Sequence, residues 1–141
     1  MPNETNLSKE NPVFPLTVNV LPGGYLPLQI FEPRYLDMVK RCMSQEIGFC
    51  IVLLRGQSES KTTKLPDHSP IGTYVEIVDF NQLENGLLGV TVQGQYRIKI
   101  LDRKVQEDGL MIADNIEEPE EEESILLEPQ YEYIWRILRE I

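Results

Sequence analysis

The stretch that decides the fold reads Leu26-Pro27-Leu28-Gln29-Ile30-Phe31-Glu32-Pro33-Arg34-Tyr35-Leu36-Asp37-Met38-Val39. An extended apolar run passes here into a helix almost without a linker. Proline lacks an amide N–H and has a fixed φ, so Pro33 suits the first position of a helix, where an N–H would have no internal partner. Glu32 is then expected at the N-cap, with its carboxylate near the positive end of the helix dipole.

The helix is predicted over residues 33–44. Its apolar residues follow the spacing i, i+3, i+4, i+7, which places them on one face: Tyr35, Met38, Val39 and Cys42. The helix start is interpreted as a structural junction made by Glu32, Pro33, Arg34 and Tyr35. Glu32 and Arg34 could orient it by hydrogen bonding to nearby backbone, and a binding role for the two is the alternative.

Short extended segments separated by turns make up most of the remaining chain. Strands are predicted at residues 13–20, 25–31, 48–54, 74–80, 87–92, 96–103 and 110–116. The turn at Glu84-Asn85-Gly86, before an alternating run, predicts a hairpin, and further breaks are expected at Gly94 and Asp108-Gly109. The first strand should hold its prolines near its ends or on a sheet edge. Many short strands with one early helix indicate an α+β protein, mainly β, built as a small antiparallel β-barrel.

Several segments are expected to lie outside this barrel domain, which is assigned to residues 12–116. Residues 1–11 are polar and predicted to be disordered. Residues 57–69 are polar without periodicity, which predicts a mobile loop. Residues 117–127 form a predicted acidic linker. Residues 128–141 read as the start of a C-terminal helical region, with a helix over 129–141.

The composition disfavours several classes of function. The chain has 141 residues, which fits one domain, and a net charge of −10. Nucleic-acid and anionic-membrane surfaces attract clustered cations, so we expect neither as a partner. The N-terminus lacks the pattern of a secretory signal, and no apolar run approaches the ~20 residues that span a bilayer. These features favour a cytoplasmic protein.

No catalytic or metal-binding constellation emerges, so we expect neither enzymatic activity nor a cofactor. The chain has no Gly-x-x-x-x-Gly-Lys-Ser/Thr phosphate-binding segment. One histidine and two separated cysteines cannot make a typical zinc site. Asp67 and His68 resemble half of a catalytic pair, but no nucleophile is placed by pattern, and a solvated loop explains them more simply. Cys42 and Cys50 are predicted to be buried free thiols, with a disulfide as the alternative.

A set of motifs in a fixed order resembles the N-terminal domain of ATP-dependent Lon proteases. The set comprises Phe14-Pro15-Leu16, Leu21-Pro22-Gly23, Leu26-Pro27-Leu28, Ile30-Phe31-Glu32-Pro33-Arg34-Tyr35, Met38, Gly48-Phe49, residues 51–54, Ile71-Gly72-Thr73, Gly86, Val92-Gln93-Gly94 and Ala113. The resemblance covers residues 13–116 and looks closest to small bacterial proteins that carry this domain alone. It implies a PUA-like barrel associated with substrate recognition and assembly of an oligomer, without the ATPase and serine–lysine peptidase regions.

Apolar residues beside two turns are the best sequence clue to a binding surface. Leu83, Leu87 and Leu88 bracket the Asn85-Gly86 turn, and Tyr25 and Leu26 follow the Pro22-Gly23-Gly24 turn. Core packing at strand ends would also explain them. The functional interpretation is an apolar groove that binds an unfolded or extended polypeptide or another protein, with unpaired strand edges adding main-chain hydrogen bonds. We therefore predict a non-catalytic protein-binding module that resembles the Lon substrate-recognition domain, and a homo-oligomer remains open.

The alternative is a PUA-like RNA-binding module. Its support is the similarity between the family's barrel and RNA-binding PUA domains, and a fold alone does not carry function. The basic residues involved would be Arg97, Lys99, Arg103 and Lys104. Arg97 and Lys99 lie two apart on one predicted strand and alternate with apolar residues, which is also typical of the solvated side of a barrel strand.

Overall fold

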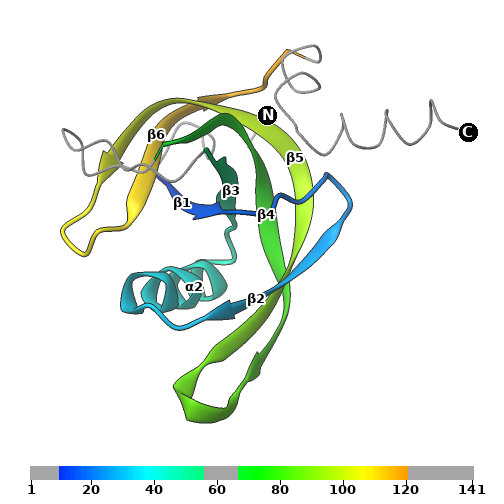
Figure 1. Cartoon of the computed structure of the whole chain (residues 1–141), viewed down its shortest axis with the longest axis vertical. Helices are drawn as coiled ribbons and strands as arrows, with labels where there is room; N and C mark the ends of the chain where they lie inside the picture. The colour runs from blue at the N-terminus through cyan, green and yellow to red at the C-terminus, as the bar shows by residue number, and fades with distance from the viewer. Residues whose placement is uncertain (1–9, 56–66, 121–141) are drawn as a thin grey trace, which may run out of the picture.

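The computed structural model of the chain describes residues 10–55 and 67–120 (Figure 1). The elements in these ranges are β1 (Asn11–Leu16), β2 (Tyr25–Ile30), α2 (Pro33–Gln45), β3 (Phe49–Leu54), β4 (His68–Gln82), the 3-10 helix η1 (Glu84–Gly86), β5 (Leu88–Val105) and β6 (Met111–Glu117). The chain is therefore mainly β with one early helix, as the sequence predicts.

Five of the strands pair in a closed ring. β5 pairs with β4, β4 with β3, β3 with β1, β1 with β6, and β6 returns to β5. Every pairing in the ring is antiparallel except β1–β3, which is parallel. β2 lies outside the ring and pairs antiparallel with the first part of β5. The ring agrees with the predicted small barrel, because closing a sheet removes its free edges.

β1 contains two prolines although it pairs on both sides. β6 pairs with residues 11–13 and β3 with residues 13–16, so the two neighbours overlap only at Val13. Pro12 and Pro15 each lie near a strand end, where β1 has a single neighbour. A proline that lacks its N–H is tolerated in such a position.

β5 is one continuous strand where the sequence predicted two. The expected break at Gly94 is a bulge in the pairing between β4 and β5. The Gly94 N–H donates to the Gly24 carbonyl at 2.9 Å, and the Gly23 N–H donates to the Gly94 carbonyl at 2.8 Å. A Cβ at Gly94 would lie 2.3 Å from the Leu21 carbonyl oxygen. The glycine therefore lets the β1–β2 connection approach β5 and does not end the strand.

The ends of several strands differ from the prediction. Asn11, assigned to the disordered N-terminus, is buried and pairs with Ala113 of β6. Glu117, assigned to the acidic linker, is the last residue of β6 and pairs with Lys99. Both differences arise because ladder pairing with a neighbouring strand continues past the point where the apolar pattern stops. The rest of the predicted linker past residue 120 and the predicted C-terminal helix lie outside the described residues.

β4 starts earlier than predicted, at His68 rather than Tyr74. The loop prediction is wrong for His68 and Ser69, which are buried in the strand. The ladder with β3 extends to the pair Leu54–His68, and the Ser69 hydroxyl accepts a hydrogen bond from the Ile71 N–H at 3.2 Å. Asp67 precedes the strand, and residues 57–66 of the predicted loop lie outside the described residues.

Two buried clusters occupy the two faces of the sheet. The first draws side chains from every strand of the ring and so fills its interior: Val13, Cys50, Val52, Ile98, Ile100, Met111, Ala113 and Ile116, with Tyr74 packed against them. The second lies between α2 and the sheet. It contains the four residues of the predicted helix face, Tyr35, Met38, Val39 and Cys42, which are all buried as expected. The ring of Phe14 from β1 packs on that of Tyr35 with centroids 4.3 Å apart.

Candidate functional site

The structure separates the five apolar residues that were predicted to form one groove. Tyr25 begins β2 and pairs with Gln93, whereas Leu88 pairs with Ile30 at the other end of β2. A six-residue strand spans roughly 17 Å, at about 3.3 Å per residue. Tyr25 and Leu26 therefore belong to one end of β2, and the three leucines around the hairpin belong to the other.

These five residues also differ in exposure. Tyr25 is 65% exposed, whereas Leu26 and Leu88 pack against the buried cluster under α2. Leu83 and Leu87 are half-buried at either side of η1, and the Leu83 N–H donates to the Leu87 carbonyl at 2.8 Å. η1 closes the predicted β4–β5 hairpin. Of the five, Tyr25 alone presents most of its side chain to a partner.

The predicted junction at the start of α2 is held by side-chain contacts. Glu32 is the N-cap residue and Pro33 the first helical residue, as expected, but the Glu32 side chain makes no cap hydrogen bond. Its carboxylate accepts a hydrogen bond from Arg34 Nη2 at 3.2 Å. Arg34 Nη1 donates to the Gly109 carbonyl at 2.9 Å, and the guanidinium lies 4.8 Å from the centroid of the Tyr35 ring. The junction therefore ties the helix start to the β5–β6 turn.

A hollow with a cavity volume of about 470 Å³ lies between the C-terminal half of α2 and the second half of β4. We call it the α2–β4 cleft. Residues from α2, from the connection to β3 and from β4 line it: Cys42, Met43, Glu46, Ile47, Glu76, Ile77, Val78, Asp79 and Phe80. None of these nine was singled out as a binding residue from sequence.

The register of β4 explains the apolar floor of the α2–β4 cleft. Ile77 pairs with Val92 and Phe80 with Val90, and both valines are buried on the face that α2 covers. A bulge between Ile77 and Asp79 inserts Val78 as an extra residue. Val78 is 48% exposed and Phe80 is 56% exposed. The break of alternation at the adjacent apolar pair Ile77-Val78 is the sequence signal that could have indicated this site.

The rim of the α2–β4 cleft is acidic. Three of the residues that line it are acidic, Glu46, Glu76 and Asp79, and the described lining residues include no Lys, Arg or His. Glu46 is the C-cap residue of α2 and has the left-handed conformation, with φ of 54°. One oxygen of Asp79 accepts a hydrogen bond from the Phe80 N–H at 2.9 Å. Carboxylates grouped without cations favour a positively charged partner.

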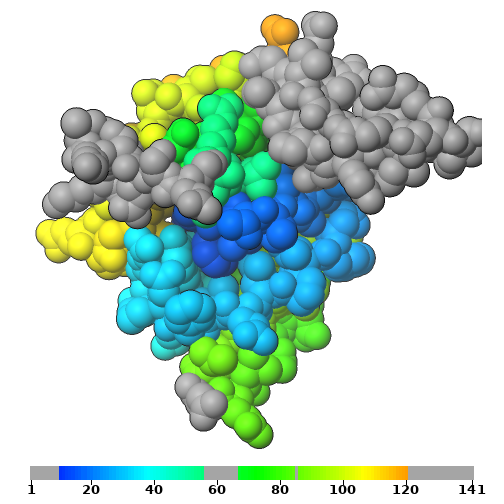
Figure 2. Space-filling view, in the orientation of Figure 1, coloured from blue at the N-terminus to red at the C-terminus, as the bar shows by residue number. Residues whose placement is uncertain are grey.

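The second half of β4 also has an open edge. β3 pairs with β4 as far as Val75, and among the described strands only β5 pairs with residues 76–82. Figure 1 shows the β4–β5 hairpin extending past the end of β3 on the side of α2, and Figure 2 shows the hairpin end projecting beyond α2 and β2. Ile47 lines the cleft and leads into β3, so the cleft lies where β3 would continue beyond Phe49.

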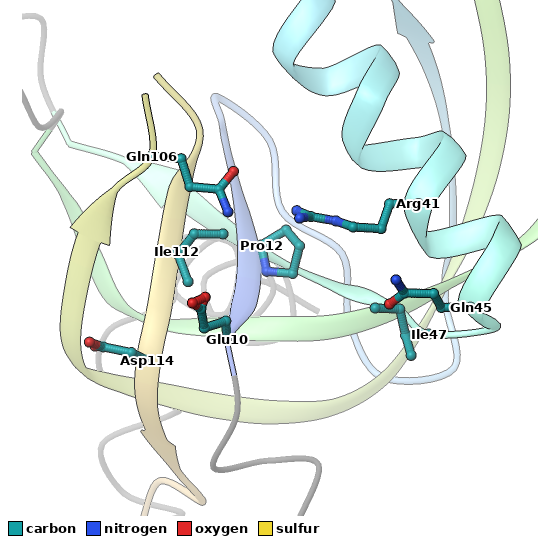
Figure 3. Close-up of a pocket in the computed structure, with 8 residues that line it drawn as sticks. All are labelled: Glu10, Pro12, Arg41, Gln45, Ile47, Gln106, Ile112 and Asp114. Carbon is teal, nitrogen blue, oxygen red and sulfur yellow. The ribbon is translucent and has the colours of Figure 1, made fainter. Parts of the chain in front are cut away.

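A second hollow, of about 460 Å³, lies on the other side of α2 (Figure 3). Figure 3 shows Arg41 extending from α2 toward Pro12 and Ile112. Glu10 and Asp114 also line this hollow, so its charges are mixed, and Glu10 forms an ion pair with Lys104 at 3.1 Å. With one ion pair already formed and charges of both signs, this hollow indicates no particular class of ligand.

The other polar groups of interest are buried in the framework. His68 is buried, its Nδ1 lies 2.6 Å from the Ser69 carbonyl oxygen, and burial lowers the pKa of the imidazole. Arg97 was interpreted as solvated, but its Nη1 donates to the hydroxyl of fully buried Thr73 at 2.8 Å. That hydroxyl donates to the Val20 carbonyl at 2.7 Å. Arg97 thus makes a structural contact inside the protein, where the sequence pattern was interpreted as the solvated side of a strand.

Both cysteines are buried free thiols, as predicted. Burial raises the pKa of Cys42 to about 11 and that of Cys50 to about 12. Within residues 10–55 and 67–120, no cluster of His, Cys, Asp and Glu side chains could hold a metal ion. No helix among the described residues is long and apolar enough to cross a membrane.

Comparison with known proteins identifies relatives across almost the whole chain. The family model of the ATP-dependent protease La (LON) substrate-binding domain matches residues 10–140. Protein cereblon of Gallus gallus is 30% identical over 106 residues, which cover 72% of this chain and 22% of the relative. A Schizosaccharomyces pombe protein named for a LON peptidase N-terminal domain and a RING finger is 32% identical over 73% of this chain and 23% of its own length. The chain thus spans about a quarter or less of these curated relatives.

Solved structures show the same fold. The Lon N-terminal domain protein of Xanthomonas campestris superposes with a TM-score of 0.65 at 27% identity, covering 94% of this chain and 73% of that one. The N-terminal domain of the Mycobacterium avium complex Lon protease gives a TM-score of 0.55 at 16% identity, covering 80% of this chain and 56% of that one. At that lower identity the likeness concerns the fold alone.

Proposed function

The chain belongs to the family of the ATP-dependent protease La (LON) substrate-binding domain, and on that premise we propose that it binds unfolded or extended polypeptide in the α2–β4 cleft without acting on it chemically. The observation that carries this proposal is the combination of exposed apolar side chains with an open strand edge in one hollow. Apolar side chains supply affinity for many sequences, and a strand edge supplies hydrogen bonds that do not depend on sequence.

The apolar contribution can be estimated from the exposed residues. Complete burial of a Val or Phe side chain yields about 1.5–3 kcal/mol, and Val78 and Phe80 are each roughly half exposed. Covering the exposed parts of both side chains would therefore contribute about 2 kcal/mol to the free energy of binding. A gain of this size supports reversible binding of exposed segments, which suits a module that samples many polypeptides.

A matched pair of aromatic substitutions tests the location of the site. We expect Phe80→Ser to weaken binding of an unfolded casein-like protein by roughly fivefold, which corresponds to about 1 kcal/mol of lost apolar contact. Tyr25→Ser removes a similarly exposed aromatic at the start of β2 and should change the affinity less than twofold. Fluorescence anisotropy measures both, with circular dichroism confirming that each variant folds.

The result can also contradict the proposal. If Tyr25→Ser weakens binding and Phe80→Ser does not, the surface at Tyr25 and Leu26 predicted from sequence is the binding site. Submicromolar RNA binding that falls steeply with salt, without affinity for unfolded protein, would instead establish the RNA-binding alternative. The acidic residues that line the α2–β4 cleft disfavour RNA binding in that cleft.

A further inference from the structure

We propose that the polypeptide enters the α2–β4 cleft as an added antiparallel strand on the edge of β4, and that it alternates apolar with basic residues. This inference rests on the proposed function and specifies how the ligand pairs and which side chains it carries. The ligand would follow the line of β3, which is itself antiparallel to β4.

The backbone of β4 is suited to receive a strand. Residues 76–82 are paired on one side with β5 and, among the described strands, have no neighbour on the other. This segment contains no proline. β2 has an outer edge too, but Pro27 lies in the middle of that strand, and a proline on an edge discourages pairing. The edge of β4 is therefore the better template.

Asp79 supplies the Phe80 amide with a local partner. The Phe80 N–H donates to its neighbour's carboxylate at 2.9 Å in an exposed position. An incoming strand would offer a backbone carbonyl to this amide and release the carboxylate. The released carboxylate could then meet a cation on the ligand.

The two faces of β4 explain the expected alternation. Ile77 and Phe80 lie on the face of the buried valines that α2 covers, so ligand side chains on that face would meet apolar surface. Glu76 pairs with Gln93 and Asp79 with Thr91, which places both carboxylates on the opposite face. Because side chains alternate between faces along a strand, every second ligand residue would approach these carboxylates. Lys or Arg fits these positions, and Asp or Glu would be repelled.

Peptides of matched composition test the alternation. A labelled seven-residue peptide of alternating Val and Lys is compared with an isomer that groups its lysines at one end, and with a Val–Glu peptide. We expect the alternating peptide to bind at least fivefold more tightly than the isomer, and the Val–Glu peptide not to bind. Equal affinity of the two isomers would overturn the proposed pattern.

Backbone N-methylation tests the added strand. N-methyl groups are placed on either of the two alternate sets of amides in the Val–Lys peptide. In a strand on a sheet edge one set faces β4 and the other faces solvent, so we expect loss of binding with one set and retention with the other. If both methylated peptides bind like the parent peptide while Phe80→Ser still weakens binding, the added strand is refuted and the proposed function survives. If neither peptides nor unfolded proteins bind, the proposed function fails as well.

Variants that replace carboxylates by neutral amides test the role of the acidic residues. Glu76→Gln combined with Asp79→Asn should weaken the Val–Lys peptide by about fivefold, because each exposed charge pair contributes a modest share. Glu107→Gln neutralises an exposed carboxylate near the β5–β6 turn and should have no effect. If both variants weaken peptide binding equally, the peptide is attracted only by the overall negative charge of the protein. That result would overturn the proposal that Glu76 and Asp79 contact its basic residues. A dimer in sedimentation that Phe80→Ser dissociates and that does not bind the Val–Lys peptide would place a second copy on this edge instead.

Discussion

Replacing Thr73 by valine should destabilise the fold more than replacing it by serine. The Thr73 side chain is fully buried, and its hydroxyl links the Val20 carbonyl in the β1–β2 connection to the Arg97 guanidinium on β5. Valine keeps the shape and removes the hydroxyl, so the Val20 carbonyl and Arg97 Nη1 each lose this partner. Serine keeps the hydroxyl and loses one methyl group.

The losses of stability expected for Thr73→Val and Thr73→Ser differ enough to be distinguished by experiment. A buried polar group that loses its hydrogen-bond partner costs about 1–3 kcal/mol, so Thr73→Val should lower the free energy of unfolding by about 2–4 kcal/mol. Loss of one buried methyl costs about 1 kcal/mol, which sets the expected effect of Thr73→Ser. For a domain of this size, 1 kcal/mol corresponds to roughly 4 °C in Tm.

Urea unfolding followed by far-UV circular dichroism measures both variants against the parent protein at pH 7. We expect the midpoint of Thr73→Val to lie clearly below that of Thr73→Ser. If the valine variant unfolds at the same or a higher urea concentration, the hydroxyl does not hold the β1–β2 connection and the reasoning is wrong.

Other predictions concern the bulge, the helix junction and the buried titratable groups. Gly94→Ala should lower the free energy of unfolding by more than about 2 kcal/mol in a urea titration, because its Cβ would meet a backbone oxygen at 2.3 Å. Glu32→Ala should lower it by less than about 1 kcal/mol, since the contact with its arginine partner is partly exposed, and peptide affinity should not change. Burial lowers the pKa of His68 below 6.5, so below pH 6.5 the imidazole takes up a proton more readily in the unfolded chain than in the folded protein. The contribution of His68 to stability should therefore be complete above pH 6.5 and decrease as the pH falls. His68→Asn should reduce the difference in urea midpoint between pH 7.5 and pH 5. Because burial raises the pKa values of Cys42 and Cys50 to about 11 and about 12, Ellman's reagent at pH 8 should react with these thiols only after denaturation.

Local patterns predicted the elements that depend on neighbours in sequence. The helical spacing of Tyr35, Met38, Val39 and Cys42 identified the buried face of α2, because a helix buries what its own periodicity aligns. Pro33 identified the helix start for a similarly local reason. The hairpin between β4 and β5 followed from turn residues at its tip.

Features that depend on distant partners were harder to predict. In the sequence Gly94 indicates a strand break, but in the structure it allows the Leu21 carbonyl to approach β5. His68 was predicted in a loop because its pairing with Leu54 of β3 is not visible in the local sequence. The α2–β4 cleft has the same origin. Its floor combines Ile47 and Phe80, which are far apart in sequence. Its open edge exists because β3 begins at Phe49, opposite Val75, so that β5 is the only described strand that pairs with residues 76–82 of β4.

Closure of the ring has a consequence for the order of events during synthesis. Asn11 in the first strand pairs with Ala113 in the last, about a hundred positions later in the chain, whereas β4 and β5 are joined by a short connection. The hairpin can therefore form while the ribosome is still adding residues, but β1 must wait for β6 to emerge before its second neighbour exists. Until then the inward apolar side chains of β1 and β3 remain uncovered, and the nascent chain is at its most vulnerable to aggregation.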